Sequence, residues 1–106
     1  MDELLSLTIE PAESGSVVKL AGELDLSTTP ILRDRLATLA GDVVVDLTDV
    51  SFLDSRAIAL LVAEHRRRVD AGAHLVVKGS SSRALRTFAV TGVDQVLDLD
   101  GDSPTR

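Results

Sequence analysis

The chain has 106 residues, of which 44% are hydrophobic, so it is long enough for one compact domain with its own core and too short for two. Its formal net charge of −6 argues against nonspecific binding to nucleic acid or to an anionic membrane surface. It contains no cysteine, which excludes disulfides and thiolate metal sites, and no apolar run approaches the roughly 20 residues of a membrane span. We therefore expect a single cytoplasmic domain over residues 1–106, with residues 100–106 as a polar tail.

Two strands joined by a turn are predicted at the start of the chain. Residues 5–10 alternate apolar and polar side chains, which is typical of a strand with one exposed face. The segment PAESGS follows with turn-forming residues, and apolar residues resume over 17–21. This pattern predicts an N-terminal β-hairpin.

A first helix is predicted after the hairpin. Residues 27–30 read Ser-Thr-Thr-Pro, which offers a helix cap and a proline near the first helical position. Apolar residues then recur at helical spacing as far as Gly41.

The central stretch predicts a strand that leads into a second helix. β-Branched residues at 43–45 indicate a buried strand over residues 43–47. After a polar segment, a helical pattern runs from Ser55 to Ala71 and ends at Gly72. Its predicted apolar stripe comprises Ile58, Leu61, Val62, His65 and Val69. The residues predicted to lie largely off this stripe are Arg66, Arg67, Arg68 and Asp70.

The rest of the chain continues the alternation of strand and helix. Residues 73–79 predict a short strand, and an apolar pattern that includes Leu85 and Phe88 predicts a third helix ending near Gly92. A last segment over residues 93–100 closes the domain. Together these elements predict an α/β fold, with a mixed β-sheet of about 4–5 strands and 3–4 helices packed on it, the later strands being parallel.

One edge of this sheet is the expected place for a functional site. Ligands and partners usually meet the loops that follow the carboxyl ends of parallel strands. The loops at residues 25–29, 48–55 and 79–82 are therefore expected to share that edge.

Enzyme chemistry finds little support in the sequence. Ser55 lies at the predicted strand-to-helix corner, but the surrounding residues lack the G-x-S-x-G pattern of a serine hydrolase. The two histidines, His65 and His74, lie on a helix stripe and at a strand start, so structural roles are expected for both. A Walker phosphate-binding loop is also missing, and we expect no catalytic residue.

Metal binding and a phosphoaspartate receiver are disfavoured too. Asp98, Asp100 and Asp102 alternate like calcium ligands, but the glycine and the final glutamate of a calcium loop are missing. Asp46 lies in a predicted strand and Lys78 ends another, which is compatible with a phosphoaspartate receiver domain. The acidic pair that a receiver has after its first parallel strand is absent, however. We therefore expect no metal site.

Covalent modification of Ser55 remains as a hypothesis. A helix start offers free N–H groups and the positive end of the helix dipole, so it tolerates a phosphate of about −1.5 to −2 charge. Next to Asp54 and Asp25, that charge would repel a docked partner without changing the fold. The alternative interpretation is that Asp54 and Ser55 form an ordinary helix cap.

Four segments carry a resemblance that covers nearly the whole chain. They are LAGELDLSTTP at 20–30, VVVDLTDVSFLDS at 43–55, AGAHLVV at 71–77 and TGVDQVL at 91–97. In this order they make the chain resemble a single STAS domain of the bacterial anti-sigma factor antagonists.

The resemblance implies a protein switch rather than an enzyme. In this family the unphosphorylated antagonist binds an anti-sigma factor, which is an ATP-dependent serine kinase, and thereby frees the sigma factor. Phosphorylation of the serine that corresponds to Ser55 ends the interaction, and a phosphatase resets it. ATP and Mg would belong to the kinase, so no cofactor is expected in this chain, nor direct contact with nucleic acid or membrane.

The residues expected to bind the partner surround Ser55. They are Asp25, Thr28, Asp54, Ser55, Arg56 and Ile58. Residues 54–59 read D-S-R-A-I-A where the family has D-S-S-G-L-G, so Arg56, Ala57 and Ala59 depart from its pattern. Arg56 either pairs with an acidic partner group or a phosphate and tunes which kinase is recognised, or is a plain exposed arginine.

A second function and the oligomeric state stay open at this point. The alternative function is a STAS module that regulates a transporter or a signalling assembly, with Ser55 only a helix cap. The protein is expected to be a monomer or a weak dimer.

Overall fold

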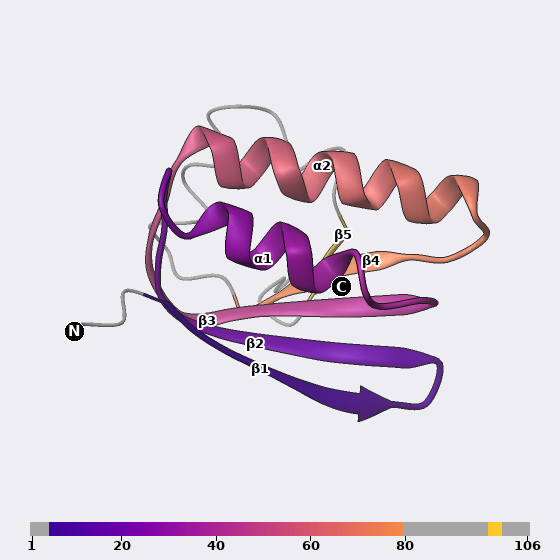
Figure 1. The fold of residues 1–106 in the computed structure, drawn as a ribbon. Helices are drawn as coiled ribbons and strands as arrows, with labels where there is room; N and C mark the ends of the chain where they lie inside the picture. Colours follow the sequence, from indigo (N-terminus) through magenta and orange to yellow (C-terminus); the bar gives the residue numbers. More distant parts are fainter. Residues whose placement is uncertain (1–4, 80–97, 101–106) are drawn as a thin grey trace.

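The computed structural model describes residues 5–79 and 98–100. The order of its elements along the chain is shown in Figure 1: β1 (Leu5–Ala12), β2 (Gly15–Leu24), α1 (Thr29–Leu36), β3 (Asp42–Leu53), α2 (Ser55–Asp70), β4 (Leu75–Lys78) and β5 (Asp98–Asp100). The predicted hairpin and the first two predicted helices are confirmed. The predicted third helix lies outside the described residues.

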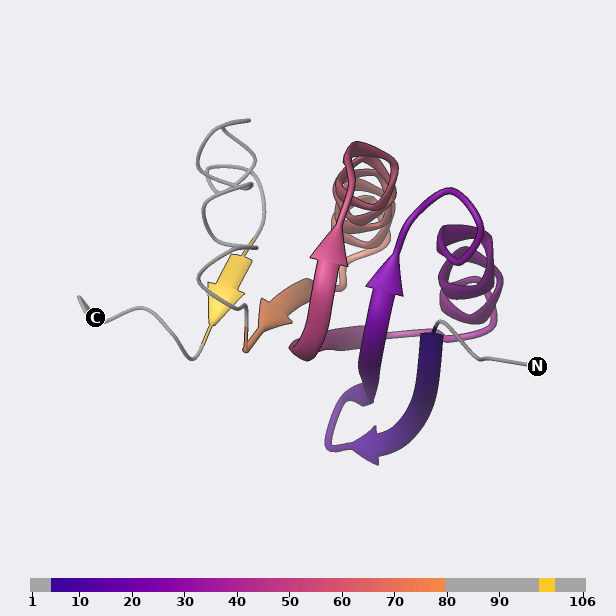
Figure 2. The same cartoon turned by 90° about the vertical axis from the view of Figure 1, so that its left-hand side faces the viewer.

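The five strands form one mixed sheet in the order β1-β2-β3-β4-β5. β1 and β2 are antiparallel, whereas β2, β3, β4 and β5 run parallel to their neighbours. Val45 is in register with Val18 on one side and Val77 on the other. Both α1 and α2 lie over the same face of this sheet (Figures 1 and 2). The predicted mixed α/β fold is therefore confirmed.

The core lies between the helices and this face of the sheet. It is built from aliphatic side chains, as the aromatic content of only 2% requires. The sheet contributes chiefly Val18, Leu20, Val43, Val45, Leu47, Leu75 and Val77. The helices contribute Leu32, Leu36, Ala57, Ile58 and Leu61. Alternate positions of each strand enter the core because side chains of a strand point to opposite faces in turn.

β3 is longer than its sequence pattern predicts. The predicted loop over residues 48–55 is wrong for most of its length, because β3 continues to Leu53 and stays paired with β2. The pairing shifts register between Lys19 and Ala21 and again between Gly22 and Glu23. Such bulges bend and twist a strand pair and break the simple alternation of side chains. The irregular polar pattern after Leu47 therefore indicates a bent strand and not a loop.

The buried face of α2 also differs from its predicted stripe. Arg68, predicted to lie largely off the stripe, is only 4% exposed, whereas Val69, predicted to lie on it, is 48% exposed. The buried positions of this helix are Ala57, Ile58, Leu61, Glu64 and Arg68. They follow helical spacing, but two of them carry charged side chains that find partners inside the molecule.

Candidate functional site

The carboxyl ends of β2 and β3 hold the candidate site. Leu24 and Leu53 end these strands in register with each other. The backbone N–H of Asp54 donates to the carbonyl oxygen of Leu24 at 3.1 Å. The loop that follows β2 and the start of α2 are therefore neighbours, at the end of the sheet where both strands turn up toward the helices (Figure 1).

Asp54 caps the start of α2. It has extended backbone angles, and its side chain accepts hydrogen bonds from the N–H groups of Arg56 at 2.9 Å and Ala57 at 3.1 Å. The predicted helix cap is therefore observed. It also changes the prediction for a phosphate on Ser55, since two of the N–H groups expected to be free are already occupied by a carboxylate.

Asp25 closes the turn between β2 and α1. Its Oδ1 accepts from the N–H groups of Ser27 at 2.9 Å and Thr28 at 3.1 Å. The hydroxyl of Thr28 donates to the carbonyl oxygen of Glu23 at 2.6 Å and accepts from the N–H of Asp25 at 2.9 Å. These bonds hold the turn in one shape beside the start of α2.

The predicted site residues separate into three groups by exposure. Ser55 and Arg56 are exposed, and Asp25 and Asp54 are half-buried. Thr28 and Ile58 are each only 4% exposed, because the hydroxyl of Thr28 bonds inside the turn and Ile58 packs in the core. The last two therefore support the site from within and do not present a contact surface in this structure.

Only the first residue of the third predicted loop is described by the structure. β4 ends at Lys78, in register with Asp46, which lies well before the end of β3. Gly79 packs against Thr48 and Asp46, has a φ of +70°, and leaves no room for a Cβ atom. The part of that loop over residues 80–82 lies outside the described residues. Only the loops after β2 and β3 are therefore shown to meet.

A groove that the sequence does not predict lies beside Ser55. It has a volume of about 430 Å³ and lies where the first turns of α1 and α2 approach each other. It is lined by Leu26, Thr29, Pro30, Arg33, Arg56, Ala59 and Leu60. Two of these residues stand out in the sequence: Arg56, which is predicted to bind the partner, and Leu26, a large apolar residue in a turn, which is 63% exposed.

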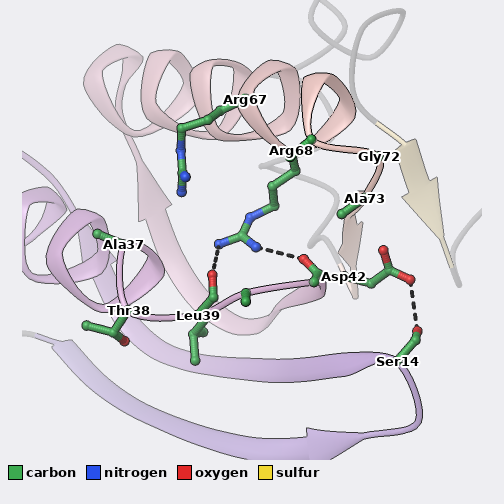
Figure 3. Close-up of a pocket in the computed structure, with 12 residues that line it drawn as sticks. Ser14, Ala37, Thr38, Leu39, Asp42, Arg67, Arg68, Gly72 and Ala73 are labelled. Carbon is green, nitrogen blue, oxygen red and sulfur yellow. Dashed lines mark hydrogen bonds between the residues drawn. The ribbon is translucent and has the colours of Figure 1, made fainter.

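A second cavity, of about 690 Å³, lies at the opposite end of the sheet and is shown in Figure 3. Arg68 crosses it and donates to the carbonyl oxygens of Gly41 at 2.7 Å, Leu36 at 2.8 Å and Leu39 at 3.0 Å. Burial lowers the pKa of Arg68, and the nearby Glu64 opposes that effect. The guanidinium therefore joins α2 to the end of α1 and the start of β3.

Asp42 makes a similar joint at the edge of this cavity. Its carboxylate accepts from the hydroxyl of Ser14 at 2.8 Å and from the N–H of His74 at 2.9 Å. These two hydrogen bonds lower the pKa of Asp42. Asp42 and Arg68 thus hold strands and helices together, and we assign these two charged groups a structural role.

The described part of the chain offers no metal site and no membrane-spanning helix. Within residues 5–79 and 98–100, no three His, Cys, Asp or Glu side chains are grouped so that they could hold a metal ion. In the same residues, neither helix is long and apolar enough to cross a membrane.

In the described residues, both helices lie over one face of a mixed sheet, and an exposed serine and a groove lie at a strand-to-helix corner. A family model described as "Mlab, STAS domain" matches residues 7–99. The chain therefore belongs to the STAS domain family.

The chain is also similar in sequence and in structure to proteins named anti-sigma factor antagonists. The chain is 29% identical over 102 residues to the anti-sigma-B factor antagonist of Bacillus subtilis, covering 93% of this chain and 94% of that protein. An anti-sigma factor antagonist from Mycobacterium paratuberculosis superposes with a TM-score of 0.80 at 27% identity, covering 95% and 86% of the two chains. The Bacillus cell fate determinant SpoIIAA in its phosphorylated form shares the fold, with a TM-score of 0.71 at 17% identity and coverage of 92% and 93%.

Proposed function

We propose that this protein is an anti-sigma factor antagonist that switches partners through Ser55. In its unphosphorylated form it binds an anti-sigma factor, which is a serine kinase, and so releases a sigma factor. Phosphorylation of Ser55 ends this binding, and a phosphatase restores it. The observation that carries the proposal is the exposed Ser55 at the corner after β3, in a STAS chain whose relatives are named anti-sigma factor antagonists.

The geometry of the corner suits such a switch. Ser55 is exposed as the first residue of α2, so a kinase reaches it without unfolding the chain. The carboxylate of Asp54 lies over the first N–H groups of the helix, and the half-buried Asp25 belongs to the adjoining turn. A phosphate on Ser55 would add to this negative charge and repel an acidic partner surface. The fold itself would stay intact, as the phosphorylated structure of SpoIIAA, which has the same fold, suggests.

The proposal leaves the chemistry to the partners. The kinase would supply ATP and Mg, and a phosphatase would hydrolyse the phosphate, so this chain would act as their substrate and not as an enzyme. It needs no cofactor of its own for this role. Sigma factors work in the cytoplasm, and we place the protein there.

Phosphorylation in vitro tests the modification site. The purified protein would be incubated with each candidate anti-sigma factor kinase of its source organism, ATP and Mg, and then mapped by mass spectrometry. We expect one phosphate on Ser55, and none in Ser55→Ala. Ser51→Ala, which changes another exposed serine near the end of β3, is expected to be phosphorylated as the parent is. If Ser55 stays unmodified by a kinase that binds the protein, the switch is wrong and a STAS module of another assembly is favoured.

A further inference from the structure

The groove beside Ser55 combines apolar walls with two arginines. Leu26 and Ala59 are exposed and Pro30 and Leu60 are half-buried, so an apolar surface faces solvent between the first turns of α1 and α2. Leu26, at 63%, is the most exposed of the large apolar side chains in the described residues, and it lines the groove. Exposed apolar surface of this kind marks a place where a partner docks.

The charges of the groove are the opposite of the charge of the molecule. The chain has a net charge of −6, yet the charged side chains that line the groove are Arg33 and Arg56. Within residues 5–79 and 98–100, Arg33 forms an ion pair with its neighbour Asp34, at 3.6 Å between exposed groups, and such a surface pair opens easily. Arg56 forms no ion pair within residues 5–79 and 98–100. Two guanidinium groups are thus available to an anionic group of a partner.

Thr29 adds an unused polar group to the same groove. It lines the groove, is only 8% exposed, and its hydroxyl has no hydrogen-bond partner in the described part of the chain. A buried hydroxyl without a partner is unfavourable, and native structures rarely leave one so. A partner that places a polar atom in the groove would relieve this cost.

We propose that this groove receives a segment of the protein partner that carries both apolar and acidic side chains. An apolar side chain of that segment would pack against Leu26 and Leu60, while a carboxylate would lie between Arg33 and Arg56. Charge favours this occupant, because the two arginines would repel a basic segment and would stay unpaired against a neutral one. The inference rests on the proposed function, since it takes the partner to be an anti-sigma factor that binds beside Ser55.

The position of Arg56 links the groove to the switch. Arg56 follows Ser55 directly and is one of the residues that line the groove. A phosphate on Ser55 would compete with the partner's carboxylate for this guanidinium and would repel that carboxylate as well. Docking and phosphorylation would therefore exclude each other at one side chain.

Charge reversal tests the groove against the anti-sigma factor kinase that the protein binds. Calorimetry would compare the parent with Arg33→Glu/Arg56→Glu and with Arg35→Glu/Arg66→Glu, whose exposed arginines lie on the same two helices outside the groove. Both double variants change the net charge equally. We expect the groove variant to bind at least about tenfold more weakly, and the control to bind within about twofold of the parent. Equal losses, or no loss in either variant, would overturn the inference.

A second readout keeps the groove apart from the proposed function. ¹⁵N-labelled protein would be titrated with a short synthetic peptide that alternates leucine and glutamate, and with its leucine-lysine and leucine-serine counterparts. We expect only the acidic peptide to shift the amide signals of Leu26, Arg33 and Arg56. We expect Thr29→Val to bind this peptide more weakly while being at least as stable as the parent, because it removes a buried hydroxyl without a partner. Shifts elsewhere, no shifts, or no preference for the acidic peptide overturn the inference. If the acidic peptide binds the parent but no anti-sigma factor does, the proposed function is wrong, whereas the preference of the groove for an acidic segment is supported.

Discussion

The backbone N–H of Asp54 donates to the carbonyl oxygen of Leu24 at 3.1 Å and joins the two loops of the candidate site. Because Leu24 ends β2 and Asp54 begins the turn into α2, this bond extends the strand pairing by one step. The sheet thereby fixes the turn of Asp25 next to Ser55. The place of the proposed phosphoacceptor is set by strand pairing and not by the loops alone.

Replacement of Asp54 by alanine is predicted to destabilise the protein at the start of α2. The variant loses the side-chain hydrogen bonds to the N–H groups of Arg56 and Ala57, which costs about 1 kcal/mol for a helix cap. Urea unfolding followed by circular dichroism measures the change. Asp54→Asn keeps a capping oxygen and is expected to lose less than half as much. A stability equal to the parent in Asp54→Ala would show that the cap contributes nothing.

Among the charged residues of α2, Arg68 is predicted to be the one whose replacement destabilises the protein most. In Arg68→Met the carbonyl oxygens of Leu36, Leu39 and Gly41 lose a buried donor, and Glu64 keeps only Arg67 as its partner. Removal of one partner from a buried charged network costs about 3–5 kcal/mol. Arg67→Met, at a side chain that is mostly exposed, is expected to cost less than about 1 kcal/mol. Thermal and urea unfolding compare the two variants, and equal losses would contradict the joint described for Arg68.

Asp42 gives the stability a defined dependence on pH. The hydroxyl of Ser14, followed by the N–H of His74, lowers the pKa of Asp42 in the folded chain. The unfolded chain, with a pKa near 3.9, then binds more protons in the acid range, so stability falls as the pH drops. The contribution is complete above the unfolded pKa and is lost as the pH falls through the folded pKa.

The measurement is the free energy of unfolding of Asp42→Asn between about pH 5 and pH 2. We expect its slope against pH to be smaller than that of the parent. Asp49→Asn removes an exposed carboxylate from the same strand and serves as the control. Some slope remains in either variant, because the pKa of Asp46 is lowered as well. Burial raises that pKa, but the hydrogen bonds from Thr48 and the charges of Lys78 and Lys19 together outweigh it. Identical slopes in Asp42→Asn and the parent would refute this role.

Much of the fold follows from local patterns in the sequence. The alternation over residues 5–10 and the β-branched run at 43–45 predict strands because side-chain period and β-propensity are properties of neighbouring residues. The start of α2 is predicted in the same way, because Asp54 is a typical helix-capping residue and its carboxylate does cap α2. The serine at the corner is therefore readable from the sequence.

Other features depend on residues that are far apart in the chain. The extension of β3 to Leu53 needs the register shifts against β2, which the polar pattern of β3 alone conceals. The burial of Arg68 depends on carbonyl oxygens of residues 36, 39 and 41, which hydrophobicity along α2 does not report. The groove forms only where α1 and α2 meet, so the sequence does not report that Arg33 lines the same groove as Arg56, a predicted partner-binding residue.

The most direct test of the switch is the affinity for the anti-sigma factor before and after phosphorylation. Isothermal titration would compare the unmodified protein with protein phosphorylated on Ser55, and with Ala12→Asp as a charge control at the far end of β1. The account predicts that the phosphate weakens binding by about a hundredfold, or about 3 kcal/mol, and that the control binds as the parent does. An equal affinity of the phosphorylated and unmodified proteins would contradict it.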